Sequence, residues 1–271
     1  MTTPPSFHRP LGKTGLSIPP VTFGTSCLGN LYQVVPDETK LAIVAEALRH
    51  CAAPVWFDSA GKYGAGLALE VLGRSLRRLG ASPSSVVISN KLGWYRTNLL
   101  APEPTFEPGV WANINHDAES RISYEGILQC HEQGCELIGR DHTPQVVSVH
   151  DPDEFLAAAT GPQDYAHRFQ QILGAYRALF ELKAKGLVQA VGVGAKDWRV
   201  IRMIAESVDL DWVMLACSLT VSSHSRELLS FIAHLNPRRG AIITSAVFNA
   251  GFPTGRLVFS SRQPAPVRDA G

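Results

Sequence analysis

Short, nearly continuous apolar runs alternate with amphipathic segments along most of this chain. Runs that are apolar throughout are typical of strands buried on both faces, and apolar residues three or four positions apart are typical of helices that pack on such a sheet. We expect strands near 21–24, 55–58, 86–90, 146–150, 190–194, 212–216 and 241–245. We expect helices near 37–50, 66–80, 118–137, 165–185, 197–207 and 225–234. This alternation predicts an α/β fold, a parallel (β/α)8 TIM barrel.

The two ends of the chain depart from this repeating pattern. Gly12 and Gly15 predict a small N-terminal hairpin within 7–19. After Ser245 the chain is rich in proline and has no apolar run followed by a helical period. We therefore expect the barrel to lack its eighth strand–helix unit, with 256–271 as an irregular tail. A fragment, closure by a partner and an adapted fold would each fit this pattern.

Length, composition and charge favour one water-soluble domain. With 271 residues, 45% hydrophobic and 18% charged, the chain suits a single barrel spanning 1–271. A formal net charge of +1 gives no electrostatic reason to bind nucleic acid or an acidic membrane, so we expect a small neutral molecule as the partner. No apolar stretch reaches the roughly 18 residues that span a bilayer, and 1–10 lacks the apolar centre of a signal peptide. We expect a cytoplasmic protein, and the sequence leaves a homo-oligomer open.

The cysteines predict free thiols rather than disulfides or a metal site. They are odd in number and scattered through the expected strands and helices: Cys27, Cys51, Cys130, Cys135 and Cys217. This distribution suits a reducing compartment. The Cys-x4-Cys spacing that begins at Cys130 matches no compact zinc pattern, so we expect no metal.

Three of the expected strands end at residues that can handle protons. Asp58, Lys91 and His150 stand at or just beyond such ends, and Tyr63 follows in the loop after Asp58. In a parallel barrel these ends share one face, where active sites form. A phenol has a pKa of about 10, and an ammonium that is itself held by a carboxylate lowers it. The four residues predict a proton relay, although singly they could be a salt-bridge partner, a solvated strand end, a buried imidazole and a loop anchor.

A long connection, 93–117, follows the third expected strand and is rich in proline and aromatic residues. Long loops at this face of a barrel usually cover the site, and exposed aromatic rings can stack on sugars. We expect Trp94 and Trp111 to contact the substrate. The alternative is that these rings only pack the loop against the barrel.

Several short motifs resemble, in order and spacing, those of the aldo-keto reductases. They are LGKTG at 11–15, FGT at 23–25, FDSAGKYG at 57–64, NK at 90–91, HDP at 150–152 and KGLVQAVGVG at 185–194. The resemblance covers about 8–255. Within the family, NKLGWY at 90–95, VHDPD at 149–153 and AVFNAG at 246–251 are most similar to the branch of L-fucose, D-threo-aldose and pyridoxal dehydrogenases.

The resemblance implies hydride transfer between NADP or NAD and the carbonyl or anomeric carbon of a sugar-like or aldehyde substrate. Tyr63 would be the general acid or base, Lys91 would lower its pKa, Asp58 would hold Lys91, and His150 would orient the substrate oxygen. The cofactor-binding residues that it implies are Thr25, Asp58, Gly194, Ala195, Ser245 and Phe248. The substrate-binding residues would be Tyr63, Trp94, Trp111 and His150.

The cofactor side of the sequence departs from the family pattern. Many relatives hold the nicotinamide carboxamide with a small residue and an asparagine after the fifth strand, where this chain has Ala195 and Lys196. Ser245 stands where many reductases stack the nicotinamide on a tyrosine, and Leu219 replaces another tyrosine of the sugar-dehydrogenase branch. No Gly-x-Gly-x-x-Gly follows an early strand, so a Rossmann domain is not supported.

Two readings from other classes compete with the dehydrogenase. One is a catalytically weak or inactive barrel that keeps a binding role or no role, which the missing eighth unit favours. The other is a metal-dependent hydrolase that uses His150, Asp151 and Asp153 with Asp58. Such sites usually gather several histidines at strand ends, and most histidines here fall in expected helices and loops.

Overall fold

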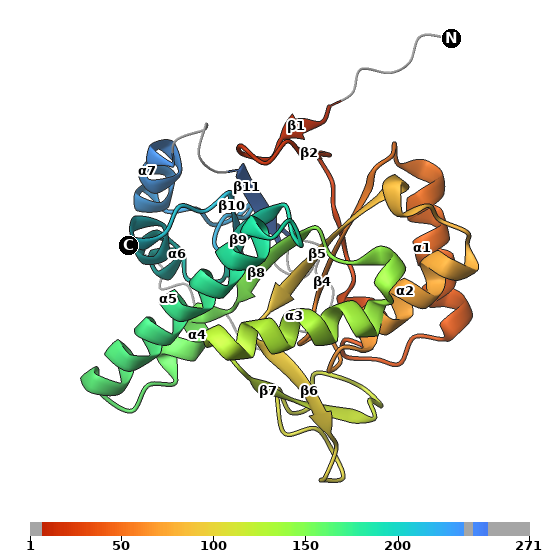
Figure 1. Ribbon diagram of the computed structural model, residues 1–271, viewed down its shortest axis with the longest axis horizontal. Coiled ribbons are helices and arrows are strands. Elements are labelled where there is room, and N and C mark those ends of the chain that lie inside the picture. The colour runs from red at the N-terminus through yellow and green to blue at the C-terminus, as the bar shows by residue number, and fades with distance from the viewer. Residues whose placement is uncertain (1–6, 236–240, 249–271) are drawn as a thin grey trace, which may run out of the picture.

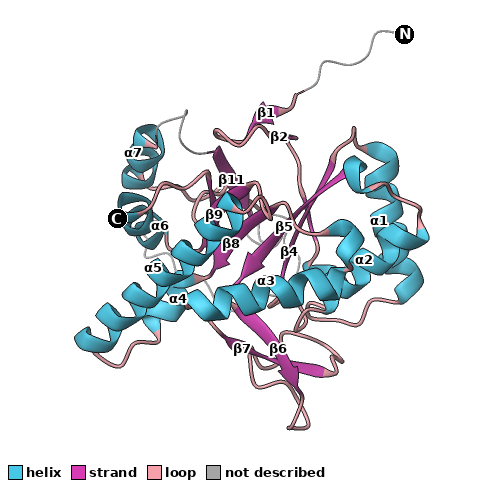
Figure 2. Cartoon of the chain, viewed as in Figure 1, coloured by secondary structure: helices cyan, strands magenta, loops and turns pink. Residues whose placement is uncertain are grey.

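A curled parallel sheet forms the centre of the molecule and helices surround it (Figures 1 and 2). The computed structural model describes residues 7–235 and 241–248. Within that part of the chain the sheet has seven strands in the order β11-β10-β9-β8-β5-β4-β3. Their bounds are β3 Phe23–Gly24, β4 Val55–Ala60, β5 Val86–Leu92, β8 Val146–His150, β9 Ala190–Ala195, β10 Trp212–Ala216 and β11 Ala241–Ser245. The expected fold is confirmed as a (β/α)8-type barrel without its last unit among these residues.

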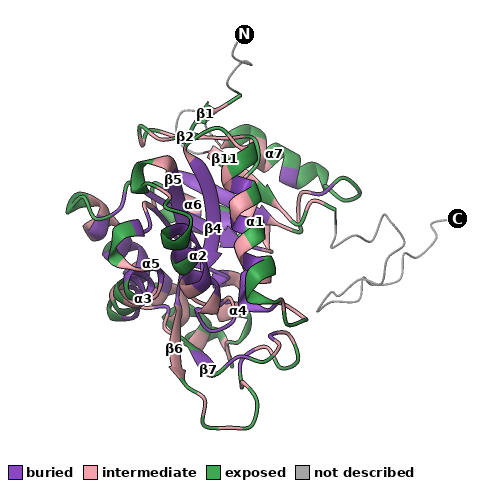
Figure 3. Cartoon of the chain, turned by 90° about the vertical axis from the view of Figure 1, so that its right-hand side faces the viewer, coloured by how far each residue is buried: buried purple, intermediate pink, exposed green. Residues whose placement is uncertain are grey.

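The helices follow the strands and cover the outer face of the sheet. They are α1 Asp37–His50, α2 Leu67–Arg78, α3 Tyr124–Ile138, α4 Pro152–Ala157, α5 Pro162–Ala184, α6 Trp198–Ser207 and α7 Arg226–His234, with 3-10 turns at Ser26–Gly29, Pro83–Ser85 and Arg140–His142. Side-chain caps fix three of the helix starts, because Ser123, Asp197 and Ser225 each accept a backbone N–H of the first turn. Figure 3 shows the resulting division between buried strands and exposed outer faces of helices. No helix among the described residues has the length and apolar character needed to cross a membrane.

The expected N-terminal hairpin is present as β1 Arg9–Pro10 paired with β2 Ser17–Ile18. It lies at the end of the barrel where the strands begin, opposite the ribbon of β6 and β7 (Figure 1). Leu11 is fully buried there against Trp56 and Trp212 inside the barrel. The hairpin therefore closes one end of the sheet with apolar side chains.

Two local predictions were wrong. The connection after β5 is not one loop, because β6 Trp94–Asn98 and β7 His116–Ser120 pair as an antiparallel ribbon. The third helix, expected from 118, begins at Tyr124, and the short helix α4 directly after His150 was not expected. Only β6 carries residues that favour strands, and β7 is mainly polar, so neither gives the continuous apolar run used to find the other strands.

Large side chains fill the interior of the barrel and require a glycine on a neighbouring strand. Trp212 is fully buried, and a Cβ placed on Gly192 would lie 2.3 Å from its indole. The two residues are opposite each other in the register of β10 and β9. A glycine at this position therefore leaves the space that the indole occupies.

We expect Gly192→Ala to lower the free energy of unfolding by about 1–3 kcal/mol or more, because the added methyl overpacks the barrel interior. Chemical denaturation would measure the change. Gly24→Ala is the matched control, since nothing lies within 4 Å of a Cβ at that strand position. Equal stability of the two variants would contradict this packing.

Candidate active site

The structure brings Asp58, Tyr63, Lys91 and His150 together at the C-terminal ends of β4, β5 and β8. The Lys91 ammonium donates hydrogen bonds to Asp58 Oδ2 and, at 3.2 Å, to the carbonyl of Ser59. Lys91 Nζ also lies 4.7 Å from the centroid of the Tyr63 ring. The rings of Tyr63 and His150 are 5.7 Å apart and nearly perpendicular, at 82°. The four side chains form one contiguous group.

Strand register and close backbone contacts place these side chains. In the strand register, Lys91 on β5 is opposite Ala60 on β4 and Ser148 on β8. This register places the Lys91 side chain next to that of Asp58 on β4. A Cβ on Gly194 would lie 3.3 Å from Lys91 Cδ, so the glycine leaves room for the lysine. Gly64, just after Tyr63, has φ of +61°, and a Cβ there would lie 2.4 Å from the carbonyl of Gly29. This close contact fixes the turn that carries Tyr63.

Lys91 lowers the pKa of Tyr63, as expected, but it does not decide the net direction of the shift. Complete burial raises the pKa of Tyr63 above the ordinary value of a phenol, and this outweighs the lowering by the Lys91 ammonium. Burial also opposes the charged form of Lys91, but its attraction to Asp58 and Tyr63 prevails and keeps its pKa above normal. Burial lowers the pKa of His150 well below its usual value, so the imidazole is neutral.

A second buried ionic cluster lies beside the four residues and was not predicted. Lys62 Nζ is 2.7 Å from Glu107 Oε1, 3.1 Å from Asp151 Oδ2 and 3.0 Å from Glu154 Oε2. Lys196 Nζ is 3.4 Å from Asp151 Oδ2 and also pairs with Glu154. We name these five residues the Lys62 cluster. The available signal was a lysine directly before Tyr63 and an aspartate directly after His150.

The Lys62 cluster includes Asp151, one of the residues that the metal-dependent hydrolase hypothesis would use. Asp151 faces two ammonium groups, and its Oδ2 is 3.7 Å from His150 Nε2. These partners hold the pKa of Asp151 well below its usual range although burial acts in the opposite direction. In the described ranges, no group of three His, Cys, Asp or Glu side chains is arranged to hold a metal ion.

The aromatic residues of the long connection pack mainly against the barrel and each other. Trp111 is only 8% exposed, contrary to the expectation of an exposed ring, and its indole N–H donates to Glu107 Oε2 at 2.8 Å. Its ring lies 5.8 Å from that of Tyr63. Trp94 is partly buried, 5.8 Å from the ring of Phe106 and 4.9 Å from Lys62 Nζ. Trp111 therefore covers one side of Tyr63.

Sequence comparison agrees with this arrangement of strands and side chains. The profile of the aldo/keto reductase family matches residues 20–266. The chain belongs to this family. It is 30% identical over 256 residues to pyridoxal 4-dehydrogenase of Microbacterium luteolum, covering 91% of this chain and 72% of that protein. It is 26% identical over 249 residues to D-threo-aldose 1-dehydrogenase of a Pseudomonas species, covering 88% and 68%.

Solved structures of other aldo/keto reductases have the same fold. An aldo-keto reductase of Bacillus halodurans in its holo form matches with a TM-score of 0.62 at 17% identity, covering 96% of this chain and 70% of that one. The glycerol dehydrogenase of Gluconobacter oxydans matches with a TM-score of 0.59 at 18% identity, covering 92% and 66%. With its family and its dehydrogenase relatives, this aldo/keto reductase is an NAD(P)-dependent oxidoreductase.

Most positions implied for the cofactor lie around the same opening of the barrel. Thr25, Gly194 and Ser245 stand at or just after the C-terminal ends of β3, β9 and β11. Thr25 is buried and its hydroxyl donates to the carbonyl of Asp58 at 3.1 Å. Phe248 is 62% exposed. Of these positions, Thr25 contacts Asp58 and Gly194 lies against Lys91.

Two further positions change the expected cofactor contacts. Ala195 is fully buried in the apolar core between sheet and helices, so its side chain does not reach the opening. Lys196 is engaged in the Lys62 cluster. Ser218, just after β10, was not predicted, and its buried Oγ has no hydrogen-bond partner within the part of the chain that the structure describes. Buried hydroxyls normally have a hydrogen-bond partner, so the Ser218 Oγ is compatible with a contact to a bound nicotinamide amide.

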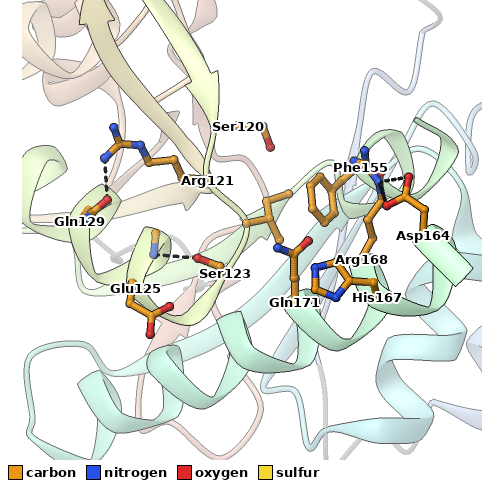
Figure 4. A pocket seen from close by; sticks show the side chains of 12 residues that line it. Ser120, Arg121, Ser123, Glu125, Gln129, Phe155, Asp164, His167, Arg168 and Gln171 are labelled. Carbon is orange, nitrogen blue, oxygen red and sulfur yellow. Dashed lines mark hydrogen bonds and ion pairs between the residues drawn. The ribbon is translucent and has the colours of Figure 1, made fainter. Parts of the chain in front are cut away.

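A separate surface pocket of about 410 Å³ lies between α3, α4 and α5 (Figure 4). Arg121 donates to Gln129 on one side of it, and Arg168 donates to Asp164 on the other. The pocket shares no lining residue with the four residues around Tyr63. We therefore keep it apart from the candidate active site.

Proposed function

We propose that this aldo/keto reductase transfers a hydride between a nicotinamide cofactor and the anomeric carbon or carbonyl of a sugar-like substrate, as an aldose 1-dehydrogenase does. The observation that carries this proposal is the contact of the buried Lys91 with both Asp58 and Tyr63. Such a group can deliver or accept one proton at a phenol oxygen. The names of the two curated relatives, a pyridoxal and an aldose dehydrogenase, support the reaction class.

In the oxidative direction, Tyr63 acts as the base that accepts the proton of the substrate hydroxyl. The base is the Tyr63 phenolate, which the Lys91 ammonium stabilises before the proton arrives, and Asp58 holds that ammonium in place. The neutral His150 imidazole lies at the edge of the Tyr63 ring and orients the substrate oxygen. A bound nicotinamide would supply the acceptor for the hydride that leaves the substrate carbon. In reduction the same proton returns from Tyr63 to the carbonyl oxygen.

The cofactor would be surrounded by five of the positions named above: Thr25, Asp58, Gly194, Ser245 and Phe248. To these we add Ser218, whose unbonded hydroxyl offers a donor and an acceptor for an amide. Trp111 would line the substrate site next to Tyr63. Trp94 would lie at the entrance of that site, where it contacts Lys62 and Phe106.

The test is a titration of the purified chain with NADPH and NADH, followed by the quenching of tryptophan fluorescence. We expect saturable binding of at least one of them, and then cofactor reduction with an aldose such as L-fucose. Binding without turnover on any aldose or aldehyde would favour a binding role for the barrel. A folded chain that binds neither cofactor would contradict the proposal.

A further inference from the structure

A chain of contacts runs from Lys62 through Glu107 and Trp111 to the ring of Tyr63. One carboxylate oxygen of Glu107 pairs with Lys62 at 2.7 Å, and the other accepts the indole N–H of Trp111 at 2.8 Å. The indole then lies 5.8 Å from the phenol ring. Glu107 is therefore the link between the Lys62 cluster and the residue that covers Tyr63.

The backbone of Trp111 is fixed independently of Glu107. Leu31 and Trp111 form an antiparallel bridge, and the amide of Ala112 donates to the carbonyl of Asn30 at 3.0 Å. These bonds hold the main chain, and apolar contacts with Phe106 and Ile114 surround the indole without fixing the direction of its N–H. Among the described residues, the hydrogen bond of the indole goes to Glu107.

Glu107 itself is held in an unfavourable backbone conformation. Its φ is +44°, in the left-handed region that a glutamate rarely adopts. Such strain persists where surrounding contacts outweigh it, and it clusters at sites with a function. The available contact is Lys62, whose side chain is only 3% exposed and whose remaining carboxylate partners, Asp151 and Glu154, lie at the end of β8 and on α4.

We propose that Glu107 is a positioning residue that holds the Trp111 indole over Tyr63, and that Lys62 is the buried cation that holds Glu107. The proposal rests on the proposed function only in taking Tyr63 as the proton-transfer residue. The structural part, the link from Lys62 to the indole, stands on the distances alone. Through this link the loop between β6 and β7 controls how deeply Tyr63 is buried.

The decisive variant is Glu107→Ala, with Glu107→Gln as the conservative partner. Glutamine keeps an acceptor for the indole and loses only the charge that Lys62 binds. We expect kcat/KM on the aldose to fall about 10- to 100-fold in Glu107→Ala, because a misplacement of about 1 Å near reacting groups has effects of that order. Glu107→Gln should lose less. Lys62→Met/Glu107→Gln, which removes one charge of each sign, should resemble Glu107→Ala.

Two readouts separate positioning from a general loss of stability. Burial is the main cause of the raised pKa of Tyr63, so uncovering the ring should move the pH profile of oxidation to lower pH in Glu107→Ala. The tryptophan emission should also shift to longer wavelength, and this shift should vanish in a Trp111→Phe background. Glu119→Gln is the control, since Glu119 lies on β7 and pairs with Arg121, just after that strand, rather than with Trp111.

The outcomes are distinct. An unchanged pH profile and emission in Glu107→Ala, or an emission shift that persists without Trp111, would overturn the proposal. Wild-type protein without turnover on any substrate would instead contradict the proposed function, and the emission comparison would still test the link between Glu107 and the indole. If Lys62→Met alone fails to fold, the charge-balanced double variant still decides the role of Lys62.

Discussion

Tyr63→Phe is expected to lower kcat by about 100- to 10,000-fold, the range that general acid–base catalysis contributes. The substitution removes the transferable proton and keeps the ring. The contacts of that ring with Trp111, His150 and the Lys91 ammonium therefore remain. Cofactor Kd should stay close to the wild-type value, because the ring still fills the same space. Steady-state kinetics and a fluorescence titration on the same preparation would measure both quantities.

The matched control for Tyr63→Phe is Tyr176→Phe. Tyr176 is also fully buried, but it lies on α5 and donates to the carbonyl of Gly192 at 3.3 Å, in the core between sheet and helices. It should retain wild-type kcat with only a modest loss of stability. Substantial turnover by Tyr63→Phe would refute the role assigned to Tyr63.

Lys91→Met is expected to have the second largest effect, on rate and on stability together. Loss of the ammonium leaves the buried Asp58 carboxylate without its partner, which costs about 3–5 kcal/mol in the free energy of unfolding. It also removes the charge that favours the Tyr63 phenolate, so the pKa of Tyr63 rises further. Since the phenolate is the base for oxidation, the pH profile should move to higher pH while kcat falls by about 100-fold.

Lys183→Met provides the matched control, because Lys183 pairs at 2.5 Å with Asp211 at the opposite end of the barrel. It should lose stability without any movement of the pH profile. If Lys91→Met alone is too unstable to assay, Asp58→Asn/Lys91→Met removes the unpaired carboxylate as well. An unshifted profile in the active variant would make Lys91 a structural residue. The shift also has the opposite sign to that expected for Glu107→Ala, so the two effects cannot be confused.

The sequence predicted the parallel strands well because strands buried on both faces are apolar throughout, and periodicity reports burial directly. The β6–β7 ribbon was missed for the same reason, since its strands are only partly buried and are not apolar throughout. The four residues around Tyr63 were found because position at a strand end can be read from sequence. The Lys62 cluster was not, because it depends on side chains that reach between separate loops.

The direction in which the pKa of Tyr63 is shifted shows a further limit of prediction from sequence. Sequence identifies the charged neighbours of a phenol but does not give the depth at which the ring is buried. In this structure burial raises the pKa of Tyr63 by more than the Lys91 ammonium lowers it. Only the packed structure ranks these two effects.

The hairpin of β1 and β2 has a practical consequence for handling the protein. It closes the end of the barrel where the strands begin, and the ribbon of β6 and β7 extends from the other end (Figure 1). A molecule tethered to a solid support near Arg9 would thus present its catalytic face to the solution. Immobilised protein of this orientation should remain open to small molecules, whereas attachment near Leu100 on the β6–β7 loop would place that face against the support.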